Sequence, residues 1–172
     1  MKPDLKFRFL TDTTTHTLRI RREFAAGRAL VWDCYTKSEL LEKWFAPTPL
    51  VTKTTHMDFS EGGYWHYAMV DPEGTHYWGR MDYRAIEPVD RYSSVDSFTD
   101  ETGTPNPDMP SADWDVTFED AEIGTLVSTT VQYASAEDLQ KVIDMGMEAG
   151  LASALENLDA LLATLDSKGS AQ

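Results

Sequence analysis

The segment Glu23–Pro47 constrains the fold more than any other part of the chain, because it places several short apolar elements in one stretch. The end of a strand is followed by apolar positions at helical spacing, which are Ala29, Leu30, Val31, Trp32 and Tyr35. Thr36 and Glu39 have the spacing of a capping box and predict a second short helix that runs to Phe45. Helices this short are not stable alone, so the rest of the chain must supply a surface for them.

The residues on either side of this segment have the alternating pattern of strands. Residues 16–24 alternate apolar and polar side chains and predict one half-buried strand. After the helices, turn residues such as Asp71–Gly74 separate strand-like runs, which predicts consecutive hairpins. The predicted strands in this part are Leu50–Phe59, Tyr64–Val70, Thr75–Ile86, Arg91–Thr99, Ala112–Glu119 and Thr125–Ala134. The Pro-rich stretch Asp100–Pro110 predicts a loop at the rim of the sheet.

The C-terminal part predicts one helix of about 30 residues. Ser135 and Asp138 form its start signal, and apolar residues then recur three and four apart as far as Leu165. Gly146 and Gly150 lie on the same apolar stripe, although each weakens a helix by about 1 kcal/mol relative to Ala. We therefore expect a strand or a ligand to approach the helix backbone there, with Gly146 against a strand and Gly150 beside a cavity.

The order of these elements predicts an α+β fold of the helix-grip type. In such a fold a curved antiparallel β-sheet wraps around a long C-terminal helix, with two short helices after the first strand, and the grip encloses a cavity. At 172 residues the chain fits one domain, 1–172, with a core over about 15–165 and a loose N-terminal extension and C-terminal tail.

Composition and charge restrict where the protein acts and what it binds. No run approaches the roughly 18 apolar residues of a membrane span, and the N-terminus lacks an export signal. The lone cysteine, Cys34, excludes an internal disulfide and suits a reducing compartment, so we expect a cytoplasmic protein. The formal net charge of −14 opposes phosphate backbones and anionic lipids, which argues against nucleic acid and membrane partners.

Several short motifs, in combination and in this order, carry a resemblance to a known family. They are Arg22-Glu23-Phe24, Val31-Trp32, Trp44-Phe45-Ala46-Pro47, Asp58 with Gly62-Gly63, Asp71-Pro72-Glu73-Gly74, Gly79 before Tyr83–Pro88, Gly124-Thr125 and Gly146–Gly150. The chain resembles the START-like (SRPBCC, birch-pollen-allergen-like) superfamily, and within it the branch named after the activator of heat-shock-protein ATPase. The resemblance implies a cup for small apolar molecules, and relatives include lipid carriers, cyclases and drug-sequestering proteins.

The hairpin pattern selects one face of the sheet as the cavity face. Pairing the strands across two tight turns puts His56 opposite Tyr67 and Tyr67 opposite Trp78, together with further aromatic and polar residues. The alternative is that Trp65, Tyr67 and Trp78 are ordinary core or a dimer contact. The predicted ligand-binding residues are Trp32, Tyr35, Trp44, Phe45, His56, Trp65, Tyr67, Met69, Trp78, Arg80, Met147, Gly150 and Leu151.

Other kinds of chemistry find little support in the sequence. There is no HExxH, CxxC or P-loop motif, so we expect neither a metal nor another cofactor. Acid–base catalysis would need a perturbed side chain in the cup, for which His56, Asp58, His76 and Asp82 are candidates. Arg22 lies in the buried phase of its strand and either pairs with an acid such as Asp58 or Glu23 or orients a ligand.

The leading hypothesis is that the protein binds a small hydrophobic or aromatic molecule in this internal cavity, with little or no catalysis. One alternative is a chaperone-associated interaction module that uses an outer surface and has a filled interior. A second alternative is a cyclase- or hydrolase-like enzyme. A homodimer and a chaperone partner stay open at this point.

Overall fold

The computed structural model describes residues 7–122 and 124–170, apart from the side chains of 166–170. Strands and helices follow one another with a pair of helices after the second strand and another pair at the C-terminus. The elements are β1 (Phe7–Asp12), β2 (Thr17–Phe24), α1 (Arg28–Thr36), α2 (Ser38–Leu41), β3 (Val51–Met57), β4 (Tyr64–Val70), β5 (His76–Glu87), β6 (Arg91–Phe98), β7 (Ala112–Ala121), β8 (Gly124–Tyr133), α3 (Ala136–Asp144) and α4 (Met147–Ser170).

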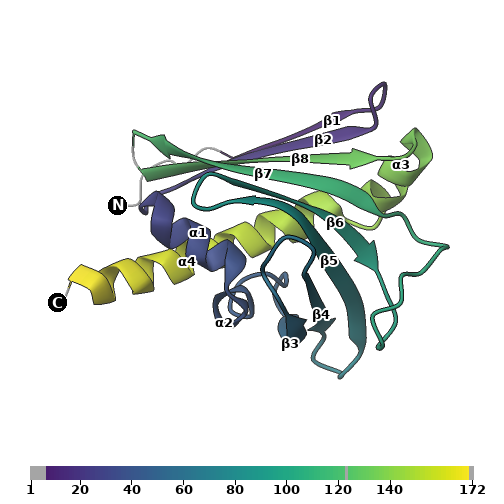
Figure 1. The fold of residues 1–172 in the computed structure, drawn as a ribbon, viewed down its shortest axis with the longest axis horizontal. Coiled ribbons are helices and arrows are strands. Elements are labelled where there is room, and N and C mark those ends of the chain that lie inside the picture. The colour runs from purple at the N-terminus through teal and green to yellow at the C-terminus, as the bar shows by residue number, and fades with distance from the viewer. Residues whose placement is uncertain (1–6, 123, 171–172) are drawn as a thin grey trace.

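The strands form one antiparallel eight-stranded sheet in the order β1-β2-β8-β7-β6-β5-β4-β3. The sheet is curved and open, with β1 and β3 at its edges, and α4 runs across its concave side (Figure 1). The pair α1 and α2 lies at one end of the grip, and α3 lies at the far end of β8 (Figure 1). This arrangement confirms the predicted α+β helix-grip fold. No helix in the described part of the chain is long and apolar enough to cross a membrane.

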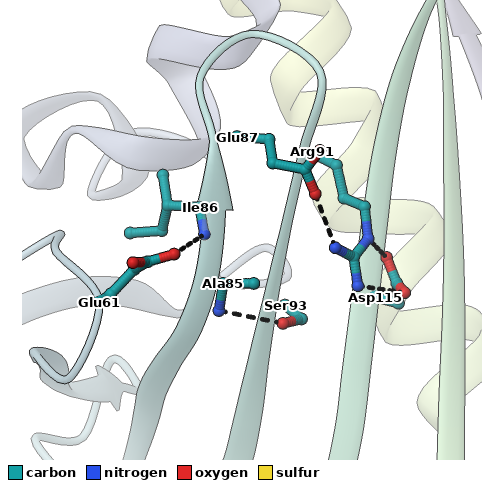
Figure 2. Close-up of polar contacts among 7 residues, drawn as sticks. All are labelled: Glu61, Ala85, Ile86, Glu87, Arg91, Ser93 and Asp115. Atoms are coloured by element: carbon teal, nitrogen blue, oxygen red, sulfur yellow. Dashed lines mark hydrogen bonds and ion pairs between the residues drawn. The ribbon is translucent and has the colours of Figure 1, made fainter.

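A bulge in β5 contributes to this curvature. The register between β5 and β6 shifts between Tyr83 and Ile86, which bends a strand and frees backbone groups from the ladder. Figure 2 shows how side chains satisfy two of these groups: the Ala85 N–H donates to Ser93 Oγ at 3.2 Å, and the Ile86 N–H donates to Glu61 Oε2 at 3.0 Å. Side chains therefore replace ladder hydrogen bonds at two positions of the bulge.

The outer face beside the bulge carries an ion-pair network (Figure 2). Arg91 donates to both carboxylate oxygens of Asp115, at 2.8 and 3.0 Å, and to Glu87 Oε2 at 2.8 Å. The Arg91, Glu87 and Asp115 side chains are all partly exposed to solvent, so these ion pairs contribute little to stability. Their geometry nevertheless ties the β5–β6 turn to β7.

The N-terminal boundary of the fold differs from the prediction. Residues expected to be a loose extension include β1, which pairs along β2 from Phe7 opposite Arg22 to Asp12 opposite Thr17. Phe7 and Phe9 alternate with polar residues and pack partly buried against the core. The period of two that identified β2 was therefore also present in β1, in a shorter form.

The helix predictions need two further corrections. The C-terminal helix is not continuous: α3 ends before Met145, and Gly146 has a φ of +89°, a left-handed value that ends a helix. The Ser135 start signal is confirmed, because its side chain accepts from the Asp138 N–H. Thr36 does not cap α2, since its hydroxyl donates to the Trp32 carbonyl at 2.9 Å. The second helix also ends earlier than predicted, at Leu41 rather than at Phe45.

Candidate functional site

A cavity of about 330 Å³ lies between the concave face of the sheet, the α1–α2 segment and α4. Its wall includes Tyr35 from α1, Phe45 from the segment after α2, and Leu151 from α4. Met145, which is 54% exposed, also lines it, so the cavity reaches the surface at the joint between α3 and α4. Small-molecule sites commonly have volumes of about 300 to 1,000 Å³ and mostly apolar walls. This space can therefore hold a small organic molecule.

The structure brings most of the residues proposed from the sequence to this wall. They come from α1, from the segment after α2, from β4 and from the start of α4. These residues are Tyr35, Trp44, Phe45, Tyr67, Met69, Met147, Gly150 and Leu151. Their position is what a ligand-binding role requires, and that role itself is a proposal taken up below.

Trp32 and Trp65 lie behind the wall rather than on it. Trp32 is packed edge-to-face against Phe118, with ring centroids 5.1 Å apart, in the aromatic core under α1. Trp65 is fully buried, stacks on Tyr67 at 4.1 Å and donates from its Nε1 to Thr54 Oγ1. The alternative that Trp65 is ordinary core is the correct one for this residue. Both tryptophans support wall residues instead of contacting the cavity.

His56, Trp78 and Arg80 lie on the outer, convex face of the sheet, contrary to the prediction. Trp78 stacks between His66 and His76, with centroids 5.2 and 5.4 Å away. Arg80 donates to Asp82 and lies over a tyrosine ring, and His56 is exposed.

The error comes from two shifts of one residue in the pairing of β4: His56 of β3 pairs with His66 instead of Tyr67, and Tyr67 has a different partner on β5. The turn after β4 contains five residues, because the Asp71 N–H donates to the Thr75 carbonyl, whereas the prediction used a four-residue turn. Tyr67 therefore pairs with Gly79 instead of Trp78. A shift of one residue moves every side chain of a strand to the other face.

The most important polar residue of the cavity is Asp96 on β6, which the sequence analysis missed. Its side chain lines the cavity, and the Tyr67 hydroxyl donates to its Oδ1 at 3.5 Å. Burial raises the pKa of Asp96 to about 7, and the Tyr67 hydrogen bond opposes this shift. The alternation of Tyr92, Ser94 and Asp96 places this carboxylate in the buried phase of its strand. The same signal had identified Arg22 and would have identified Asp96.

Tyr67 reaches Asp96 because β5 has a glycine between them. Gly79 pairs with Tyr67 on one side and with Phe98 of β6 on the other. A methyl group at position 79 would lie 2.6 Å from the Tyr67 hydroxyl oxygen. The ring therefore lies flat over the backbone of β5, which only a glycine permits.

Burial also determines the state of the tyrosines in the wall. It raises the pKa values of Tyr35, Tyr67, Tyr92 and Tyr133, so all four hydroxyls are protonated near neutral pH. The neighbouring Asp96 carboxylate raises the pKa of Tyr67 and Tyr133 further. The wall thus offers neutral hydroxyl groups beside a single shifted carboxyl group.

Arg22 lies at another part of the wall and has several partners. Its Nη2 is 3.5 Å from Glu156 Oε1, its Nη1 donates to the Glu23 carbonyl, and its guanidinium lies 4.9 Å over the ring of Phe24. The predicted pairing with a carboxylate is confirmed, although the partner is Glu156 on α4 instead of Asp58 or the side chain of Glu23. This partner is 68% exposed at the edge of the grip.

The remaining candidates for chemistry lie away from the cavity. His56, Asp58 and His76 are exposed, and Asp82 pairs with Arg80 on the outer face. In residues 7–122 and 124–170, no three His, Cys, Asp or Glu side chains gather as metal ligands would. Among the described residues that line the cavity, Asp96 is the one with a carboxylate side chain.

Gly150 lies beside the cavity, as predicted. Gly146 was predicted to pack against a strand, and the structure does not show this contact. Gly150 lines the cavity, and a methyl group there would meet only Pro47, at an ordinary 3.7 Å. A methyl group at Gly146 would meet none of the described atoms within 4 Å, so none of the described strands packs against it. Gly146 is required for its left-handed φ instead.

Comparison with known proteins gives one family and several similar structures. The model of the family described as Activator of Hsp90 ATPase homolog 1-like protein matches residues 25–163. No curated protein matches the chain.

Two solved structures have high similarity over nearly the whole chain. Protein Ms6760 from Mycobacterium smegmatis is 33% identical, with a TM-score of 0.85, over 94% of this chain and 99% of that one. A protein from Arthrobacter aurescens is 30% identical, with a TM-score of 0.86, over 91% of each chain. CalU16 from Micromonospora echinospora, at 18% identity and a TM-score of 0.60, covers 95% of this chain and 89% of its own and shares the fold.

Proposed function

We propose, from the premise that this chain belongs to the Activator of Hsp90 ATPase homolog 1-like family of the START-like superfamily, that it binds a small apolar or aromatic molecule inside the grip. The observation that carries this proposal is the cavity of about 330 Å³ with its largely apolar and aromatic wall. Hydrophobic walls with a few placed polar groups are the usual composition of small-molecule sites. The buried, unbonded Cys34 is consistent with action in the cytoplasm, which we include in the proposal.

The cavity favours this function over the two alternatives from other classes. A chaperone-associated module would act through its outer surface and has no need of an open interior. An acid–base enzyme would use Asp96 as a base and a neutral tyrosine hydroxyl as a proton donor, but this polar pair occupies one part of a wall that is largely apolar and aromatic. The extent of the apolar wall therefore favours binding over catalysis.

The proposal can be tested by filling the cavity from α4. Gly150→Leu places a large side chain in the space beside Pro47, whereas Ala160→Leu adds apolar volume on the exposed side of the same helix. We expect the neutral fluorescent probe N-phenylnaphthylamine to bind the native protein and Ala160→Leu saturably, and Gly150→Leu at least about tenfold more weakly. Melting curves must show that both variants are folded.

Either of two results would overturn this function. One is no saturable binding of the probe by the native protein, together with no co-purified small molecule in native mass spectrometry. The other is unchanged binding by a folded Gly150→Leu variant, which would place the probe outside the cavity.

A further inference from the structure

We propose that the cavity selects an apolar molecule that carries a protonated amine, and that Asp96 and Tyr67 bind this group. The inference rests on the proposed function and names the ligand class of the same cavity. It depends on the placement of the charged groups in the wall and on which of them already have partners.

The described wall contains two charged side chains, Arg22 of β2 and Asp96 of β6, and their positions can be compared along β8, which lies between these strands in the sheet. Arg22 of β2 pairs with Val127 of β8, whereas Asp96 lies in the row that continues through Ala112 to Tyr133. Val127 and Tyr133 are six positions apart on one strand, which is about 20 Å at the usual rise per residue. The cavity therefore has a positive end near α1 and a negative end near the joint between α3 and α4.

Partners distinguish these two ends. Arg22 already contacts a carboxylate, a backbone carbonyl and an aromatic ring. Asp96 receives one long hydrogen bond of 3.5 Å, from the neutral Tyr67 hydroxyl. On the outer face, by contrast, Asp113 and Asp115 both pair with arginines, at 3.2 and 2.8 Å. Among the described residues, Asp96 thus has no cationic partner of the kind that its neighbours on the other side of the sheet have.

A ligand can supply this cation. An ionised carboxylate removed from water without a partner is unfavourable, and an ammonium group at hydrogen-bond distance offsets that cost. Tyr67, Tyr133 and Trp114 also line the cavity, and aromatic rings attract cations. The raised pKa of Asp96, caused by burial, agrees with a carboxylate that lacks its counter-ion.

Long-range charge acts in the same direction. The net charge of −14 raises the concentration of cations near the protein and disfavours anions. Arg22 at the other end repels an ammonium group, so the amine is directed to Asp96 and the apolar body lies along the wall between Asp96 and Arg22. The position of Gly79 under Tyr67 then fixes the hydroxyl that completes the contact.

Three probes with one apolar frame test the inference by isothermal titration calorimetry: tryptamine, tryptophol and indolepropionic acid. They differ in carrying an ammonium, a hydroxyl or a carboxylate on the same indole frame. At about pH 8, where Asp96 is ionised, we expect tryptamine to bind about tenfold or more tighter than tryptophol, and the acid to bind most weakly.

Two variants assign the effect to Asp96. Asp96→Asn keeps the shape of the side chain and should weaken tryptamine binding about tenfold while changing tryptophol binding less than about twofold. Asp113→Asn removes the same charge from the outer face of the neighbouring strand and should change neither. This control separates a direct contact from the general attraction of an acidic protein for cations.

The possible failures are distinct. Equal affinity for tryptamine and tryptophol, or unchanged tryptamine binding by Asp96→Asn, overturns the amine inference and leaves the binding function intact. Loss of tryptamine binding in both variants also overturns it, because bulk charge would then be the cause. No binding of any probe, together with failure of N-phenylnaphthylamine to bind, overturns both proposals.

Discussion

The interior of the grip has two ends of opposite character. Under α1, rings fill the space: Trp32, Phe59, Tyr92 and Phe118 pack with centroids 5.1 to 6.1 Å apart. We call this the filled end. Toward the joint between α3 and α4, Tyr67, Asp96, Tyr133 and Met147 instead surround the cavity, and we call this the hollow end.

The difference shows how one fold separates stability from binding. Edge-to-face aromatic packing at the filled end stabilises the protein without any ligand. A cavity, in contrast, lowers stability in proportion to its volume, so a hollow end is a cost that binding can offset. Tyr92 of the sheet contributes to both ends, because its ring packs against Trp32 and also lines the cavity.

The largest expected effect comes from deleting a ring at the filled end. Trp32→Ala should lower the free energy of unfolding by about 3 to 5 kcal/mol, because a large cavity would form in close-packed surroundings. Met147→Ala, at the hollow end, removes a side chain that already faces empty space and should lose less than half as much. Urea unfolding measures both. Similar losses would remove the distinction between the two ends.

The second effect is a pH dependence that arises at the hollow end. Asp96 has a pKa of about 7 in the folded protein and an ordinary value of about 4 in the unfolded chain. The folded state therefore binds more protons between these values, so the free energy of unfolding falls as pH rises from about 4 to about 7. The Tyr67 hydroxyl, which donates to Asp96, and the Tyr133 hydroxyl, whose pKa Asp96 also raises, stay protonated over this range.

We expect this contribution to be about 2 kcal/mol, less than the full shift implies, because the opening of the cavity lets solvent screen the charge. Asp96→Asn should remove the slope, whereas Asp113→Asn on the outer face should keep it. Urea unfolding at several pH values measures the slope. A slope that survives in Asp96→Asn would assign the titration to another group.

The two glycines near the hollow end should respond in opposite directions. Gly146→Ala should lose about 1 to 2 kcal/mol, because its φ of +89° is unfavourable for a residue with a side chain. Gly150→Ala should gain up to about 1 kcal/mol, since helix propensity improves and Pro47 stays at an ordinary contact distance. Thermal melts with ligand-free protein decide this. Destabilisation by both would mean that the helix start is close-packed.

The smallest effect should be that of Arg22→Met. Its carboxylate partner, Glu156, is 68% exposed, so removing the guanidinium leaves no buried charge without a partner. A methionine of similar length can fill the space, and the change in the free energy of unfolding should lie within about 1 kcal/mol. A loss of about 3 kcal/mol or more would show that Arg22 organises the wall around it.

The sequence allowed the order and type of nearly all elements to be predicted, because period and turn residues are local signals. Tyr64–Val70, for example, is a strand with the predicted bounds. Features that depend on a single residue of spacing were not predicted. The fifth residue of the turn at Thr75 moved Trp78 and Arg80 to the outer face, and no local pattern distinguishes a four-residue from a five-residue turn there.

The candidate site was likewise predicted only in part. Wall residues from helical or aromatic segments, such as Trp44 and Leu151, lie where the apolar pattern placed them. Asp96 occupies the buried phase of its strand, as Arg22 does, but the candidates for acid–base chemistry were taken from the hairpins that carry His56 to Asp82. Its role becomes visible only when Gly79 lets Tyr67 extend across β5 to meet it.

The break at Gly146 bears on rates rather than on affinities. Because the chain leaves helical geometry there, α3 is a separate nine-residue unit, held by the buried side chains of Leu139 and Val142 and by one exposed tether, the Lys141 ammonium, which donates to the Asp108 carbonyl at 3.0 Å. A helix of this length is marginal alone, so we expect this unit to open before the rest of the fold. Weakening that tether would accelerate the arrival and departure of a guest together, and the dissociation constant, as their ratio, would stay unchanged.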